Sequence, residues 1–192
     1  MKPQLVIGSA NPDKVAELRE LLVDHFDVVA RPADAPETIE DEPTLLGNAT
    51  KKAVEIAAFT GLPALGDDTG LFVEALDGRP GVYSARYAGE QATYDENVDK
   101  LLGELAGVTD RQAEFRTSVV IAYPDGRLVE ALGVVTGTIG DERTGSAGFG
   151  YDPVFLPHEA AGRSFAQLTK AEKHAISHRA RALEALRARL QG

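Results

Sequence analysis

The chain contains no cysteine among its 192 residues. It can therefore form neither disulfides nor thiolate zinc sites. It also lacks any apolar run close to the roughly 18 residues that a membrane-spanning helix needs, and its first residues show no signal-peptide pattern. A reducing cytoplasm is compatible with these absences, and we expect a cytoplasmic protein that makes no membrane contact.

Positive charge is scarce as well, because 20 Lys and Arg face 30 Asp and Glu, which gives a formal net charge of −10. Such an acidic protein does not offer a general nucleic-acid-binding surface. An anionic ligand would need a local basic pocket and a divalent cation. The length suits a single domain over residues 1–192, built as two lobes.

Strand-like and helix-like patterns alternate along the chain. Short apolar runs predict strands at 5–8, 26–29 and 154–156, and apolar stripes predict helices at 12–23, 44–59, 94–105 and 169–190. The β-rich runs 113–123 and 127–139 are joined by Pro124-Asp125-Gly126, which is a hairpin signal. A hairpin argues against a purely parallel sheet, so we expect a mixed α/β sheet with flanking helices.

A pair of carboxylates lies in the stretch Gly66-Asp67-Asp68-Thr69-Gly70, between two apolar runs. Glycine lets a ligand approach the backbone, and neighbouring side chains on a strand point to opposite faces. Only one of Asp67 and Asp68 can therefore readily face a ligand, and the other holds the local structure. The alternative is an Asp/Gly-rich turn between two core segments.

An anion site is predicted where the first strand leads into the first helix. Asn11 suits the N-cap, Pro12 suits the first helical position, and Lys14 adds a cation. Free backbone N–H groups and the helix dipole favour an anion at such a place. An ordinary capped helix with a solvated lysine remains the alternative.

Three further segments carry candidate functional groups. The acidic run that includes Glu40 and Glu42 is either a solvated loop or a source of a metal ligand. The Gly-rich segment 145–153 is either a turn or a nucleobase site, because its glycines expose backbone groups and its aromatic residues offer ring faces. In the last helix, Lys173 and His178 are candidate anion contacts near the N-terminus, and Arg179 lies further round an ideal helix.

Five segments together resemble the inosine triphosphate pyrophosphatase family, the house-cleaning enzymes for non-standard purine nucleoside triphosphates. These segments are Ser9–Lys14, Gly66–Gly70, Gly81–Tyr87, Gly148–Pro153 and Lys173–Arg179. They occur in the family's order and the similarity spans nearly the whole chain. The resemblance implies an elongated mixed α/β fold, with two lobes around a central nucleotide-binding cleft. It also implies a homodimer that uses Mg²⁺ to hydrolyse ITP, dITP and XTP to the monophosphate and pyrophosphate.

The resemblance also implies roles for individual positions. Asp68 matches the catalytic carboxylate, and Glu40 together with Asp68 matches the metal ligands, with Glu42 as a rival to Glu40. Gly47 departs from the family pattern, which has an acid at this position. The implied substrate contacts are Ser9, Ala10, Asn11, Pro12, Asp13, Lys14, Thr69, Phe149, Gly150, Tyr151, Asp152, Lys173, His178 and Arg179.

From these residues we expect Asp68 and the metal to activate a water that attacks the α-phosphorus, while Lys14 stabilises the departing pyrophosphate. Two other functions stay open at this point. One is a nucleotide-binding sensor without turnover, and the other is a pyrophosphatase for modified pyrimidine nucleotides and 7-methylguanine nucleotides.

Overall fold

The computed structural model describes residues 2–191, which form two compact units built from interleaved segments of the chain. The first unit takes the chain up to Asp68, then Thr117–Gly133, then the part from Arg179 onward. The second unit consists of Thr69–Arg116 and Val134–His178. No helix within residues 2–191 is long and apolar enough to cross a membrane.

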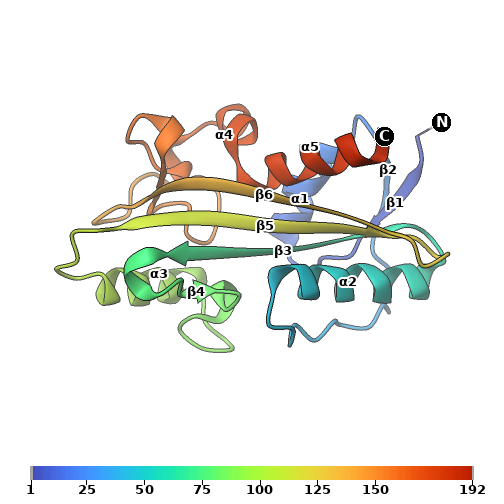
Figure 1. Ribbon diagram of the computed structural model, residues 1–192, viewed down its shortest axis with the longest axis horizontal. Coiled ribbons are helices and arrows are strands. Elements are labelled where there is room, and N and C mark those ends of the chain that lie inside the picture. The colour runs from blue at the N-terminus through green and yellow to red at the C-terminus, as the bar shows by residue number, and fades with distance from the viewer. Residues whose placement is uncertain (1, 192) are drawn as a thin grey trace. The chain divides into compact units, whose positions relative to one another are not determined.

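A seven-stranded mixed sheet is the framework, with the strand order β2-β1-β3-β5-β6-β7 and with β4 paired to β3 (Figure 1). The strands are β1 Gln4–Ile7, β2 Asp27–Val29, β3 Ala64–Val73, β4 Pro80–Gly81, β5 Gln112–Ala122, β6 Leu128–Ile139 and β7 Phe155–Pro157. Strand β1 pairs in parallel with β2 and β3, whereas β4 and β7 pair antiparallel with β3 and β6. The predicted mixed α/β sheet with flanking helices is confirmed.

In the first unit, helices cover both faces of the sheet (Figure 1). Helices α1 Pro12–Leu22 and α5 His178–Gln191 pack on one face, and α2 Leu45–Thr60 packs on the other. Successive strand residues alternate between the two cores, since Leu5 and Leu65 pack with α1 and α5 while Val6 and Ala64 pack with α2. This alternation follows from the two-residue period of a strand.

The second unit has its own core, which is rich in aromatic side chains. Its helices are α3 Tyr94–Glu104 and α4 Lys170–Ile176, and its 3₁₀ turns are η1 Glu74–Leu76, η2 Ser84–Arg86, η3 His158–Ala160 and η4 Phe165–Gln167. Phe115 meets Phe155 edge-on at 4.7 Å between ring centroids, and Phe155 stacks with Phe165 at 5.3 Å.

Most element predictions are confirmed to within one or two residues, and the predicted Asn11 cap of α1 is confirmed. The Asn11 side chain accepts the N–H groups of Asp13 and Lys14 at 2.9 and 3.1 Å. Capping boxes open α3 and α4, each with a threonine at the N-cap and a glutamate three residues later.

The prediction of one helix over 169–190 is wrong, because the chain breaks at Ser177. This residue has extended backbone angles (φ −68°, ψ 150°), and α4 ends just before it while α5 begins just after it. Serine has a modest helix propensity and readily takes extended angles at helix ends. The neighbours His178 and Arg179 both lie in α5 but belong to different units.

Candidate functional site

Predicted site residues come together with residues that the sequence analysis did not select, in two groups, one in each unit. The first, here called the charged cluster, consists of Lys14, Glu40, Lys52, Asp67 and Asp68. Strand alternation carries Asp67 toward α1 and α5 and Asp68 toward α2. Helix α2 lies directly on the strand at Gly66, where an added Cβ would meet the Ala49 carbonyl oxygen at 2.0 Å. This close approach brings α2 side chains within reach of Asp68.

Asp67 is the fully buried carboxylate of the charged cluster and lies beside two cations. Its side chain is 0% exposed, with the Lys14 Nζ at 3.3 Å and the Arg179 Nη2 at 3.5 Å from Oδ2. Burial alone would raise the pKa of Asp67, but the charges of Lys14, Arg179 and Lys52 outweigh it and lower the pKa to about 2. Asp67 therefore stays ionised and holds Lys14 in place.

Asp68 has a different environment, although it is only 4% exposed. Burial raises the pKa of Asp68, and the charge of Glu40 adds to that rise. The cations Lys52 and Lys14 and the hydrogen bond from Asn48 lower the pKa, but the net direction is upward. A buried carboxylate with a raised pKa is suited to accept a proton from a water molecule.

Glu40 joins this cluster and Glu42 does not. The Lys52 Nζ lies 2.8 Å from the Glu40 Oε1 and 3.6 Å from the Asp68 Oδ1, so one ammonium serves two carboxylates. The Glu42 side chain is exposed, and its backbone N–H donates to the Asn48 Oδ1 at 3.0 Å. This geometry favours Glu40 over Glu42 as the second carboxylate beside Asp68.

The charged cluster is not a preformed metal cage. Among residues 2–191, no group of three or more His, Cys, Asp or Glu side chains is arranged to hold a metal ion. Mg²⁺ commonly uses one or two carboxylates and completes its shell with waters and substrate phosphates. Glu40 and Asp68 fit that need, since a cation, the Lys52 ammonium, already lies between them.

The segment Ser9–Lys14 differs from the predicted anion site in one respect. Pro12 has no N–H, and the N–H groups of Asp13 and Lys14 are taken up by the Asn11 side chain. The expectation of free backbone N–H groups at this helix end is therefore wrong for this conformation. What remains for an anion is the Lys14 ammonium, together with the small polar side chains of Ser9 and Asn11.

The second group, here called the aromatic cluster, consists of Tyr94, Phe149, Asp152, Phe165 and Lys173. The Asp152 Oδ2 accepts the Phe149 N–H at 2.9 Å and the Lys173 Nζ at 2.7 Å. The same ammonium lies 5.2 Å from the centre of the Phe149 ring and 5.7 Å from that of Phe165. The cluster thus combines one buried ion pair with ring faces.

Glycines make the Phe149 turn possible. Gly148 has φ +76°, and a Cβ at this position would lie 2.0 Å from the Asp152 Oδ2. Gly150 has φ +63°, which is also in the left-handed region that favours glycine. The turn therefore presents Phe149 between two residues that could not carry a side chain without strain.

Tyr151 does not offer the ring face that the sequence predicted. It is buried in the second unit's core, and its hydroxyl donates to the Ser84 carbonyl oxygen at 2.9 Å. Burial raises the pKa of Tyr151. Tyr94, which the sequence analysis did not select, is instead the ring next to Phe149, with 5.9 Å between centroids. Its place at the first position of a capped helix carries no signal for this role.

His178 and Arg179 are both buried rather than exposed to a ligand. The His178 ring lies 4.6 Å from the Phe115 ring, centroid to centroid. Arg179 is 1% exposed, and its guanidinium contacts Glu17 as well as Asp67. Glu17 follows Lys14 by three residues on α1, a spacing that places both on one helix face. Thr69, next to Asp68 on β3, is half-buried.

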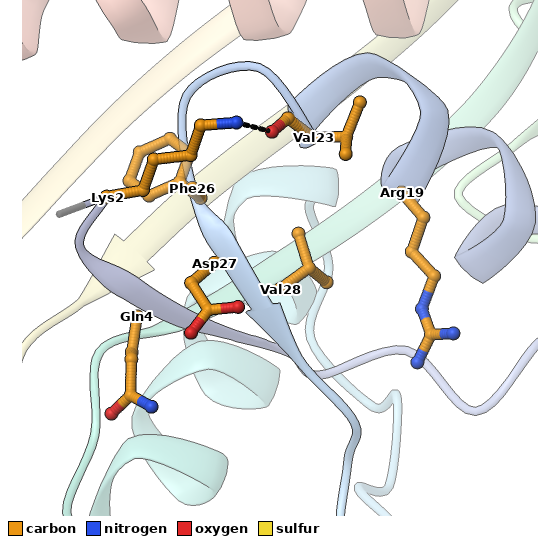
Figure 2. A pocket seen from close by; sticks show the side chains of 7 residues that line it. All are labelled: Lys2, Gln4, Arg19, Val23, Phe26, Asp27 and Val28. Carbon is orange, nitrogen blue, oxygen red and sulfur yellow. Dashed lines mark hydrogen bonds between the residues drawn. The ribbon is translucent and has the colours of Figure 1, made fainter.

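Two open pockets contain none of the predicted site residues. Figure 2 shows the pocket at the β2 edge of the first unit, lined by Lys2, Gln4, Arg19, Val23, Phe26, Asp27 and Val28. The other, of about 450 Å³ in the second unit, includes Phe72, Glu114, Arg116 and His158 in its lining. Neither pocket contains the carboxylates and lysines of the charged cluster, and we treat each cluster as a candidate site within its own unit.

Known proteins resemble this chain over nearly its whole length. The sequence model of the Ham1 family matches residues 5–189. The chain belongs to the Ham1 family. The dITP/XTP pyrophosphatase of Desulfotalea psychrophila is 45% identical, with 98% of this chain and 85% of that protein aligned. The protein of the same name from Rhodospirillum centenum is also 45% identical, over 96% of this chain and 93% of the relative.

Solved Ham1 structures share the fold. The Staphylococcus aureus Ham1 protein has a TM-score of 0.87 and 37% identity, with 98% of each chain covered. A HAM1 protein from Coxiella burnetii has a TM-score of 0.88 and 39% identity, over 100% of this chain and 99% of that one. The family resemblance that the five sequence segments indicated is therefore confirmed.

Proposed function

We infer that this Ham1 chain hydrolyses the non-standard purine nucleoside triphosphates ITP, dITP and XTP to the monophosphate and pyrophosphate. The observation that carries the inference is the convergence of Glu40 and Asp68 on one ammonium, with Lys14 beside Asp68. Relatives that are 45% identical over nearly the whole chain bear the name dITP/XTP pyrophosphatase.

In the reaction we propose, Asp68 is the general base. A carboxylate oxygen of Asp68 takes a proton from a water molecule, and the oxygen of that water forms a bond to the α-phosphorus. The bond from the α-phosphorus to the bridging oxygen then breaks, and pyrophosphate leaves with the bonding electrons. The ammonium groups of Lys14 and Lys52 offset the negative charge of the phosphates.

Magnesium is the cofactor that we propose for this site, held by Glu40 and Asp68. When bound, it would neutralise phosphate charge and polarise the phosphoryl oxygens. The Lys52 ammonium contacts the same two carboxylates and keeps them close together.

The aromatic cluster is the part that we propose for the base. Phe149 supplies a ring for stacking, and the glycines on either side of it leave the backbone without side chains next to that ring. Hypoxanthine and xanthine carry a 6-oxo acceptor and an N1 donor, and adenine reverses that polarity. An unpaired buried polar group costs about 1–3 kcal/mol, so a site matched to the 6-oxo edge rejects adenine.

Pyrophosphate release from ITP, XTP, GTP and ATP, with and without Mg²⁺, tests this function. We expect Mg²⁺-dependent release from ITP and XTP and little from GTP or ATP. Tight binding without release would instead support a nucleotide sensor, and release from modified pyrimidine nucleotides alone would support the other pyrophosphatase class. Equal turnover of all four purines would remove the house-cleaning role.

We also propose that the enzyme works as a homodimer in the cytoplasm, as the family resemblance implies. Light scattering coupled to size-exclusion chromatography measures the mass of the particle. A mass twice the 20.4 kDa of one chain is the expected result, and a mass of one chain would contradict the dimer.

A further inference from the structure

Asn48 is a polar residue next to the charged cluster, and it is fully buried, at 0% exposure. Both ends of its amide are used. The Nδ2 group donates to the Asp68 Oδ2 at 3.1 Å, and the Oδ1 atom accepts the Glu42 N–H at 3.0 Å. Only one orientation of the amide satisfies both partners, because a flipped amide would point donor to donor and acceptor to acceptor.

The bond to Asn48 separates the tasks of the two Asp68 oxygens. Oδ2 takes a neutral donor, which satisfies it without cancelling the charge of the carboxylate. Oδ1 faces the cations, with the Lys52 Nζ at 3.6 Å and the Lys14 Nζ at 4.0 Å. The Asn48 amide therefore fixes the orientation of the Asp68 carboxylate. Its Oδ1 atom remains directed at the ammonium groups of Lys52 and Lys14.

The bond to the Glu42 N–H fixes the loop that carries Glu40. This loop lies against the first turn of α2, since a Cβ added at Gly47 would be 2.8 Å from the Glu42 Cβ. This close packing leaves no room for a side chain at position 47. Gly47 fits there, although the family pattern has an acid at this position. Asn48 and Lys52 are four residues apart on α2, so both reach the same loop and the same carboxylate.

We propose that Asn48 is a positioning residue for the reaction, acting through Asp68 and through the loop that holds Glu40. The inference rests on the proposed function, because it assigns the residue a task in that site. Groups that orient metal-binding or catalytic carboxylates typically change metal affinity or activity by about 10–100-fold when they are replaced.

One variant is Asn48→Asp, which has nearly the same shape. It still accepts the Glu42 N–H, but it replaces the neutral amide donor with a second carboxyl group, and two buried carboxyl groups at this distance share a proton, so that Asp68 is no longer held as a charged acceptor. We expect kcat for ITP to fall by about 10–100-fold, with KM changed less than about 3-fold, because the contact is made to the carboxylate and not to the nucleotide. Asn48→Ala removes both contacts, and it serves as the second variant if Asn48→Asp does not fold.

Asn97 offers a matched control in the second unit. It is also buried on a helix, and its amide also bridges two groups outside that helix, accepting the Ala88 N–H at 2.7 Å and donating to the Ala85 carbonyl oxygen at 3.0 Å. Asn97→Ala should lower the melting temperature as Asn48→Ala does, while kcat measured well below melting stays within about 2-fold of the wild type. Equal losses of kcat in the two alanine variants would overturn the proposal.

A second readout does not depend on turnover. Mn²⁺ binding in the presence of inorganic tripolyphosphate, followed by electron paramagnetic resonance, reports on Glu40 and Asp68 directly. We expect binding about 10-fold weaker in Asn48→Asp and unchanged in Asn97→Ala.

If the wild type released no pyrophosphate from any triphosphate, the proposed function would fail, and Mn²⁺ binding would decide on Asn48 alone. Unaltered Mn²⁺ binding in Asn48→Asp, or no binding by the wild type, would overturn the assignment.

Discussion

The charged cluster of the first unit and the aromatic cluster of the second bury polar groups in different ways. In the first, several ionised side chains share partners, so that Lys14 faces two aspartates and Lys52 faces Glu40 and Asp68. In the second, one ion pair is surrounded by rings and backbone hydrogen bonds. Shared charges suit a reaction that moves charge, whereas rings and fixed hydrogen bonds suit recognition of a flat ligand.

The two units also differ in the charge state of their buried groups. The first unit keeps Asp67 charged by surrounding it with cations. The second keeps two tyrosines, Tyr87 and Tyr151, in the neutral form, because burial raises the pKa of each hydroxyl. We therefore expect changes in the charged cluster to act on kcat and changes in the aromatic cluster to act on KM and on base selectivity.

The largest effect is expected for Asp68→Asn. This change removes the proton acceptor and should lower kcat for ITP by about 10³-fold. The fold should survive, because the amide does not carry the cost of burying a charge. Pyrophosphate release and circular dichroism measure the two properties, and near-normal turnover would show that Asp68 is not the base.

Next in size is the loss of the ion pair in the aromatic cluster. Lys173→Met leaves the Asp152 carboxylate buried without its ammonium partner, which should lower the free energy of unfolding by about 3 kcal/mol. Adding Asp152→Asn should recover much of that loss. Urea denaturation measures it, with the exposed Lys170→Met on the same helix as the control, expected within about 0.5 kcal/mol of the wild type.

A smaller effect is expected at Tyr94, which is 40% exposed and lies against Phe149. A ring contact of this kind contributes about 0.5–1.5 kcal/mol. Tyr94→Ala should therefore raise KM for ITP by about 2–10-fold without changing kcat. Tyr83→Ala is the control, since that ring is exposed in the same unit outside the cluster. A fall in kcat without a change in KM would contradict the assignment of catalysis to the charged cluster and of base binding to the aromatic cluster.

The smallest effect concerns alkaline pH. Burial and the hydrogen bond to Glu104 raise the pKa of Tyr87 to about 12, from a usual value near 10. The raised value means that the folded protein favours the protonated hydroxyl. This contribution to stability is complete below about pH 10 and is lost as the pH rises toward 12. In an absorbance titration of phenolate, Tyr87→Phe should remove one late-titrating group, and an unchanged titration curve would contradict the assignment.

Part of the charged cluster could be predicted from the sequence, because the features that orient Lys14, Asp67 and Asp68 are local, whereas Lys52 was not predicted. The two-residue period of a strand separates Asp67 from Asp68, and the Asn11 cap places Lys14 at the start of α1. These features depend on a few neighbouring residues and on backbone geometry alone. The family resemblance then assigned chemistry to positions whose neighbours the sequence could not show.

Other features could not be predicted from the sequence, because they depend on contacts between distant segments. No glycine or proline marks the break at Ser177, so the periodic pattern continued through it. The burial of Tyr151 depends on Ser84, which lies 67 positions earlier in the chain. Asn48 looked like an ordinary helix residue, since its partners lie on a loop and on a strand.

The chain passes from one unit to the other at four points, after Asp68, Arg116, Gly133 and His178. Neither unit is a continuous piece of the gene, so neither could be gained, lost or exchanged by a single recombination event. Under the proposed assignment of base binding to the aromatic cluster, a lineage would alter its choice of base by substitutions within the second unit, while the charged cluster stayed in the same polypeptide. Protein engineers face the same restriction, since a chimera that exchanges the second unit must splice two separate segments.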